Sequence, residues 1–184
     1  MMLDLYRPQP DWFAHNPYGI HGIAHVARVL VWAEQLAEQL VESGADVDRE
    51  AVRWAAVLHD VGRWDDGRDR EHGERSAAWV LANASLLPAK LEEQTLAKVV
   101  YCCRWHVPAD SLAPEMTNEL QCLKDADGLD RVRIFDLDPK HLRLPGARLL
   151  VQSSWDLFEA TYPPSRDDPF CQVREAARAR GLWR

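Results

Sequence analysis

The sequence has no uninterrupted apolar segment near the roughly 20 residues that a helix needs to cross a bilayer. Its first residues, MMLDLYRPQPDW, do not place a basic segment before an apolar core, so we expect no secretion leader and a cytoplasmic protein. Basic residues are outnumbered, with 22 Lys and Arg against 29 Asp and Glu and a net charge of -7. We therefore expect neither a membrane nor a nucleic-acid polymer as a partner.

Cysteine is also scarce, and no two of the four cysteines have the CxxC spacing found in many zinc sites. We expect these cysteines to be free, buried thiols. A nucleophilic Cys102 or Cys103 assisted by His106 is a weaker alternative, because one helical turn brings many such pairs together by chance.

Runs of alternating β-branched residues are missing, and apolar residues instead recur every three and four positions along most of the chain. This pattern predicts an all-α fold, a single-domain bundle of about six to eight helices. We expect one domain over residues 1–184, in which the helices within 146–180 pack on the preceding ones; a homodimer is compatible with this organisation. The expected helices cover residues 21–43, 46–62, 72–86, 88–106, 115–133, 146–161 and 168–179.

Four of the seven histidines lie on the expected core helices or at their ends. A single buried histidine is more often structural than a metal ligand. Here, however, carboxylates lie on neighbouring helices, and a buried carboxylate is costly unless a positive group neutralises it. A divalent metal held by imidazole and carboxylate does this directly. The histidines are His25, His59, His72 and His106.

Three motifs resemble those of the HD superfamily of metal-dependent phosphohydrolases. The motif HVARV contains His25, the doublet in HDVGR contains His59 and Asp60, and KDADGLD contains Asp127. Their order and separations fit that family over residues 21–133. The resemblance implies an HD-type helical domain in which these four residues bind a metal.

The donor types in these motifs limit the choice of metal. Imidazole and carboxylate together suit Mn, Fe, Co, Ni or Zn, and carboxylate also accepts Mg. Three or four protein ligands leave positions open for water, whose pKa a bound metal lowers. The resemblance implies a phosphomonoesterase or phosphodiesterase that acts on a small phosphorylated metabolite, with a nucleotide expected. Asp60 is the natural bridge between two ions and takes a catalytic role.

His72 and His106 lie between the His-Asp doublet and Asp127, where two-metal members of the superfamily carry further histidines. The resemblance therefore implies that these two residues could bind a second ion. Each also has a simpler interpretation. His72 could merely open a helix, and His106 could be a cation favoured by the dipole at a helix C-terminus.

Further polar residues share helix faces with the expected ligands, at spacings of three or four residues. Asp130 lies one turn from Asp127 and could orient water or a substrate hydroxyl in a catalytic role, or pair with an arginine. Asp125 should point away from the metal, because residues two apart on a helix face nearly opposite directions. The candidate substrate ligands, which could instead form salt bridges with surface carboxylates, are Arg28, Arg63, Lys124, Arg131 and His21.

Two other function classes remain open at this point. Some HD proteins with additional histidines hold two irons and cleave carbon bonds with oxygen. A non-catalytic HD module with a structural metal or a bound ligand is the third class. The intact pattern of ligands with open positions favours hydrolysis over both alternatives.

Overall fold

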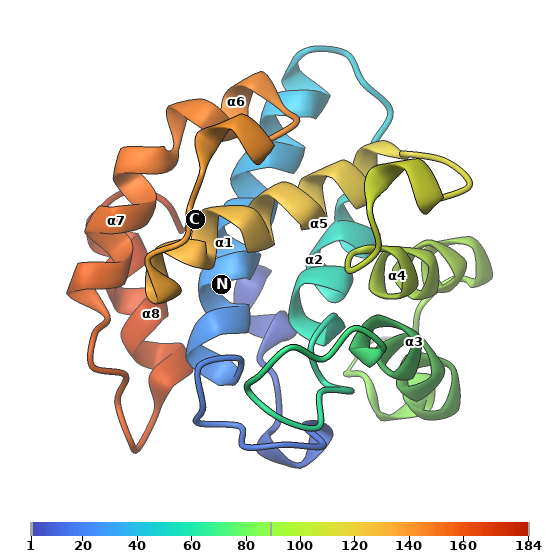
Figure 1. The fold of residues 1–184 in the computed structure, drawn as a ribbon, viewed down its shortest axis with the longest axis horizontal. Helices are drawn as coiled ribbons and strands as arrows, with labels where there is room; N and C mark the ends of the chain where they lie inside the picture. Colours follow the sequence, from blue (N-terminus) through green and yellow to red (C-terminus); the bar gives the residue numbers. More distant parts are fainter. Residues whose placement is uncertain (1, 89, 184) are drawn as a thin grey trace.

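Helices supply all the regular secondary structure in residues 2–88 and 90–183, the part of the chain that the computed structural model describes (Figure 1). This confirms the predicted all-α, single-domain bundle. The predicted domain limits, residues 1 and 184, and residue 89 of the predicted fourth helix lie outside the described residues. No helix in the described part is both long and apolar enough to traverse a bilayer.

The α-helices follow the predicted order along the chain. They are α1 (Ile23–Glu42), α2 (Arg49–Leu58), α3 (His72–Asn83), α4 (Glu93–Trp105), α5 (Asn118–Leu129), α6 (Pro145–Leu149), α7 (Val151–Ala160) and α8 (Pro169–Ala179). Short 3₁₀ helices connect or extend them: η1 (Met2–Tyr6), η2 (Pro10–Trp12), η3 (Ala84–Leu86), η4 (Asp110–Leu112), η5 (Asp130–Ile134) and η6 (Pro139–His141).

Side chains that accept a backbone N–H mark where three helices begin. Asp48 accepts from the third residue of α2, Thr117 from the third residue of α5, and Asp168 from the third residue of α8. Such caps satisfy N–H groups that have no partner inside the helix. The first turns of these helices are therefore fixed by local sequence.

Several helices differ in extent from the prediction, and three of the differences have a clear local cause or form. The fourth begins at Glu93, because the backbone of Glu92 is extended at ψ 152° and Pro88 therefore does not open it. The predicted sixth helix is divided at Leu150 into α6 and α7. α2 ends at Leu58 and not at Gly62.

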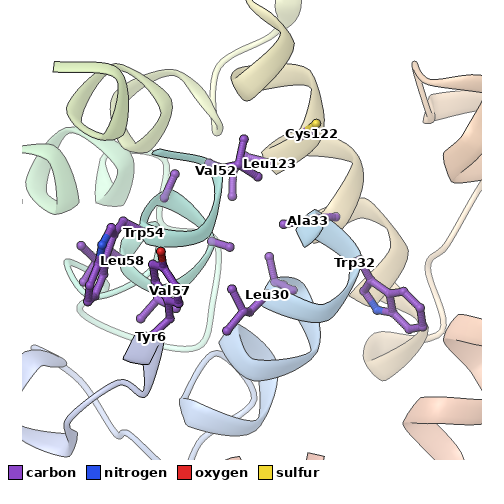
Figure 2. Packing of buried hydrophobic residues seen from close by; sticks show 14 of the residues in the cluster. Tyr6, Leu30, Trp32, Ala33, Val52, Trp54, Val57, Leu58, Cys122 and Leu123 are labelled. Atoms are coloured by element: carbon purple, nitrogen blue, oxygen red, sulfur yellow. The ribbon is translucent and has the colours of Figure 1, made fainter. Parts of the chain in front are cut away.

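α1 lies at the centre of the bundle and packs against α2, α5 and α8, while α3 and α4 pack on each other beyond α2 (Figure 1). Figure 2 shows apolar side chains from α1, α2 and α5 meeting between these helices. Because a close-packed interior resists deformation, the helix ends that carry the motifs are held rigidly relative to one another. Fully buried side chains in this core include Leu30, Trp32, Trp54, Leu58 and Leu123.

Gly62 allows the segment after α2 to touch the backbone of α3. A Cβ placed on Gly62 would lie 2.5 Å from the backbone nitrogen of Ser76 and 2.8 Å from the carbonyl carbon of Arg75. The N–H of Gly62 donates to Ser76 Oγ at 3.0 Å, and its carbonyl accepts from Arg75 Nε at 2.9 Å. This contact fixes α3, and with it His72, against the His-Asp doublet.

Substituting Gly62→Ala should lower the free energy of unfolding by about 1–3 kcal/mol, because two backbones must separate to admit the methyl group. Urea denaturation of the metal-free protein measures this change. The matched control is Gly128→Ala inside α5, where the new Cβ meets only a side-chain carbon of Leu142, at 3.2 Å. This control should be neutral or slightly stabilising, because alanine is the better helix former. Equal effects of the two substitutions would contradict the close packing at Gly62.

Candidate metal centre

The residues of the three motifs come from the ends of different helices. His25 lies in the first turn of α1, and His59 and Asp60 directly follow α2. His72 is the first residue of α3, and His106 caps the C-terminus of α4. The packing of these helices therefore brings together side chains that are distant in the sequence.

Two of the histidines donate Nδ1–H to backbone carbonyls within their own helix ends. His59 donates to Ala56 at 2.9 Å, and His106 donates to Cys103 at 2.7 Å. The carbonyl of Ala56 is the one that the N–H of Asp60 would use in a continued helix, which accounts for the end of α2 at Leu58. The Nε2 atoms of both rings are left to face the interior.

The other two histidines follow the same rule with different acceptors. His72 donates Nδ1–H to the carbonyl oxygen of Asp69. His25 donates it to the carboxylate of Asp130 at 2.7 Å. Such hydrogen bonds set the tautomer and orientation of metal-binding histidines, because the second nitrogen then carries the free lone pair.

One half of the cluster forms around His25 and His59. Their Nε2 atoms are 3.2 Å apart. Oδ2 of Asp60 lies 3.4 Å from Nε2 of His25 and 3.6 Å from Nε2 of His59. Oδ1 of Asp127 lies 3.5 Å from Nε2 of His25. Four donor atoms thus surround one small space.

The other half forms around His72 and His106, whose Nε2 atoms are 2.9 Å apart. Here it is Oδ1 of Asp60 that faces them, at 3.0 Å from Nε2 of His72 and 3.8 Å from Nε2 of His106. The two oxygens of Asp60 therefore face two different pairs of histidines.

The protonation of the cluster fits a bound cation. Burial, together with the other histidines, lowers the pKa of His59 to about 3, so its ring is neutral and Nε2 has no proton. Burial alone would raise the pKa of Asp60, but His59 and the other surrounding histidines hold it well below its ordinary value. An anionic carboxylate facing neutral imidazole lone pairs is the donor set that a divalent transition metal requires.

The family model for the HD domain matches residues 22–132, which include α1 through α5 and carry every residue of this cluster. The chain belongs to the HD domain family. This places it in a superfamily of metal-dependent phosphohydrolases that act on small phosphorylated substrates. Comparison with curated proteins and with solved structures found no match.

Within this HD domain, Asp127 reaches the cluster and Asp125 does not. Asp125 is fully buried and accepts from the backbone N–H groups of Arg143, at 2.8 Å, and Leu144, at 2.7 Å. The guanidinium of Arg143 also donates to it at 3.0 Å. Asp125 therefore anchors the segment that precedes α6, on the opposite side of α5.

Asp130 and Arg28 pair with each other, and pairing with an arginine is one of the two roles that the sequence left open for Asp130. Asp130 is fully buried behind His25 and accepts its Nδ1–H, so the structure places this carboxylate against the ring and not on an exposed surface. Arg28 is only 4% exposed and donates to Asp130 through Nε at 2.5 Å and Nη2 at 3.0 Å. Helical spacing gave the correct face of α1, but η5 and α7 cover that face.

Lys124 is held by groups outside the cluster. Its Nζ donates to the carbonyl of Pro108 at 2.5 Å and to Oδ1 of Asp110 at 2.9 Å. Arg143 donates to the same Asp110 carboxylate. Lys124 thus fastens the loop around η4, and it also lines a cavity of about 210 Å³ together with His106 and Asp127.

A cavity of about 220 Å³ lies directly over the cluster. A larger cavity of about 890 Å³ adjoins it and shares His21, Arg63 and Arg131 as lining residues. Apolar side chains from three segments form one part of its wall. They are Ile20, Val107, Pro108, Leu112 and Ile134.

Arg131 and Arg63 are the predicted cationic residues that do face these cavities. Arg131 lines both of them and also a third cavity of about 210 Å³ that includes Asp127. Its guanidinium is half-exposed and pairs with Asp136. Arg63 is held by the carbonyl of Gly67 at 2.6 Å, and its Nη1 lies 3.8 Å from Oδ1 of Asp60.

His21 lies beside the cluster, as its position one turn before His25 suggested. Its Nδ1 is 3.1 Å from Oδ2 of Asp60 and 2.9 Å from Nη2 of Arg133. Nδ1 can donate to the carboxylate or accept from the guanidinium, and the two hydrogen bonds are therefore alternatives. Burial lowers the pKa of His21, which favours the neutral ring that both arrangements need.

Arg133 is the residue that sequence reasoning missed. It lines the cavity over the cluster, with Nη1 4.0 Å from Oδ1 of Asp127 and 3.7 Å from Oδ2 of Asp130. A continuous helix would turn Arg133 away from Asp127, but the chain tightens to a 3₁₀ helix at Asp130, which aligns residues three apart. The signal was the DRVR sequence, which forms the last turn of the helix expected over residues 115–133.

The buried cysteines do not support the thiol alternative. Cys102 and Cys103 are fully buried, and burial raises the pKa of both thiols well above the ordinary value. A thiol that stays protonated is a poor nucleophile. The backbone carbonyl of Cys103, and not its thiol, contacts His106.

Proposed function

We propose that this protein is a metal-dependent phosphohydrolase that acts on a small phosphorylated molecule, with a nucleotide as the expected substrate. The observation that carries the proposal is the convergence of four Nε2 atoms on the two oxygens of Asp60 beneath a cavity lined by arginines. The chemistry that a bound divalent ion supplies is a water of lowered pKa and a polarised phosphoryl oxygen. The proposed ligands are His25, His59, Asp60 and Asp127, with His72 and His106 for a second ion.

The chain's own groups account for substrate binding. The guanidinium groups of Arg63, Arg131 and Arg133 line the cavity over the cluster, so phosphate oxygens there would meet cationic donors. His21 lies beside Oδ2 of Asp60 and would provide a proton carrier there, while Arg133 contacts His21 and would provide a cationic donor near Asp127. These groups would hold the scissile phosphate against the metal ligands and replace the water that surrounds it in solution.

The larger cavity supports a nucleotide over a smaller phosphate ester. Its volume of about 890 Å³ lies in the range of pockets that enclose whole organic ligands. Arg68 and Arg70 line it together with apolar side chains such as Leu112 and Ile134. A ligand with a polyanionic part and a flat apolar part suits this combination.

The test is a screen of purified protein, loaded with Mn, Co, Ni or Mg, against nucleoside monophosphates, dinucleoside polyphosphates, cyclic dinucleotides and sugar phosphates. We expect turnover of a nucleotide in at least one metal form. Demonstrable metal binding without turnover of any phosphate ester would overturn the proposal and favour a non-catalytic module.

Within such an assay, Arg131→Gln should raise KM by roughly 10- to 100-fold, the scale of one hydrogen bond to a charged group. Its effect on metal content should be small, because Arg131 is not among the converging donors. The control is Arg180→Gln at the exposed C-terminal end of α8, whose side chain bonds only a carbonyl of its own helix. An unchanged KM for Arg131→Gln would exclude it from substrate binding.

The second candidate is a two-iron oxygenase, and the bridging position of Asp60 between two histidine pairs is the observation that favours it. Anaerobic purification followed by iron analysis and absorption spectroscopy distinguishes the two. An iron-free preparation that hydrolyses phosphate esters would exclude the oxygenase. Iron bound in a two-to-one ratio with oxygen-dependent turnover would exclude the hydrolase.

A further inference from the structure

The contact behind His25 extends far beyond the metal cluster. Asp130 uses Oδ2 to accept from Nδ1 of His25 at 2.7 Å, and both of its oxygens accept from Arg28. The guanidinium of Arg28 then reaches α7, where Nη1 lies 3.4 Å from Oγ1 of Thr161 and Cζ lies 5.5 Å from the ring centre of Phe158. A continuous chain of contacts therefore runs from α7 to a metal ligand.

Thr161 is oriented to receive Arg28. Its hydroxyl lies 2.8 Å from the carbonyl of Leu157 and 3.2 Å from that of Phe158, so it donates its proton to the helix that it caps. The oxygen lone pairs are then available to the guanidinium. Thr161 and Asp130 are both fully buried, so water does not compete for these contacts.

We propose that Asp130 and Arg28 are positioning residues for His25, and that α7, through Thr161 and Phe158, holds Arg28 in place and so sets the metal affinity of the centre. This inference rests on the metal-binding part of the proposed function. α7 begins at Val151, beyond the last residue of the HD match, so the helix lies outside the part of the chain that the family model describes.

The physical consequence concerns the tautomer of His25. An ionised Asp130 carboxylate accepts the Nδ1 proton, which leaves Nε2 unprotonated toward Asp60 and Asp127. Without Arg28 the carboxylate would be a buried charge with one partner fewer, and it would no longer be held in the plane of the ring. Loosening α7 should therefore weaken metal binding without touching a ligand.

Two variants test this chain at different points. Asp130→Asn keeps the shape but offers an amide N–H to Nδ1, so His25 should change to the Nε2–H tautomer. Nitrogen-15 spectra of the metal-free protein report that change, with the signal assigned through His25→Gln. Co²⁺ affinity, measured by competition with a chelator, should fall by about 10- to 100-fold.

Thr161→Val removes the acceptor for Arg28 together with the hydrogen bond that the hydroxyl donates within its own helix. We expect Co²⁺ affinity to fall several-fold with an altered Co²⁺ absorption spectrum. The matched control is Ser154→Ala, because Ser154 is buried in the same helix and its hydroxyl bonds only Val151. The control should keep the wild-type affinity and spectrum even if it is slightly less stable.

Equal Co²⁺ affinity and spectra in Thr161→Val and Ser154→Ala would show that α7 does not act on the centre. An unchanged His25 tautomer in Asp130→Asn would remove the positioning role of Asp130. Wild-type protein that binds no Co²⁺ would overturn the proposed function as well, which separates that failure from failure of the present inference alone.

Discussion

Replacing Asp60 with asparagine should reduce phosphate-ester hydrolysis by on the order of 10³-fold, the scale expected when a charged group at the reacting centre is lost. Asp60 presents Oδ2 to His25 and His59 and Oδ1 to His72. Asparagine keeps the volume but is neutral, and its amide nitrogen turns a donor toward one of the histidine pairs. Both halves of the centre are therefore damaged by one substitution. Steady-state kinetics at saturating Mn or Co, with metal content from mass spectrometry, measures the effect.

Asp125→Asn is the matched control for this experiment, since Asp125 is also buried but lies on the opposite side of α5. It should keep its metal and most of its activity. Its free energy of unfolding should nevertheless fall by about 1–3 kcal/mol, because the N–H groups of Arg143 and Leu144 lose a charged acceptor. An active Asp60→Asn enzyme with full metal content would falsify the central place of Asp60.

The double substitution His72→Ala and His106→Ala should lower the metal content from two ions per chain to one. These two rings face Oδ1 of Asp60, and removing them leaves the donor atoms of His25, His59 and Asp127 in place. Hydrolysis should fall by roughly 10²-fold or more, because one of the two metal ions that would stabilise charge on the phosphoryl oxygens is lost. Calorimetric titration with Mn or Co gives the stoichiometry directly.

The control for that pair is His15→Ala with His141→Ala, which also removes two histidines but none of the converging Nε2 atoms. It should bind as many ions as the wild type. One ion per chain in both the wild type and His72→Ala, His106→Ala would show that the centre is mononuclear. The nearby histidine pair would then need another explanation, such as substrate binding.

Much of the fold was accessible from sequence because the spacing of apolar residues, and the capping side chains of three helices, are local signals. Asp48, Thr117 and Asp168 cap helices through their own side chains, and the spacing of apolar residues gave the buried faces. The HVARV and HDVGR motifs then placed His25 and His59 at ends of adjacent helices. The sequence did not show which segments pack over those helix ends and which side chains they contact.

Three residues whose surroundings depend on distant segments show this limit in physical terms. Arg28 shares a face with His25, but only the position of α7 determines that its charge is buried against Thr161 and Asp130. Arg133 faces the cavity because η5 is a 3₁₀ helix and is wound more tightly than an α-helix. No single residue in the sequence predicts that change of helix type. Lys124 is paired with Asp110, which belongs to a loop outside α5 and could not be assigned to it from sequence.

The carbonyls that hold three of the four histidine rings belong to the main chain, at Ala56, Asp69 and Cys103. Substitution of these residues cannot remove a backbone carbonyl. The orientation of the three rings is therefore insensitive to side-chain changes there, as long as the helix ends keep their shape. His25 alone depends on a side chain for its aim. Among these four histidines, it is therefore the one through which evolution could adjust metal affinity gradually. Changes at Asp130, Arg28 or Thr161 would alter the orientation of its ring while leaving every donor atom in place.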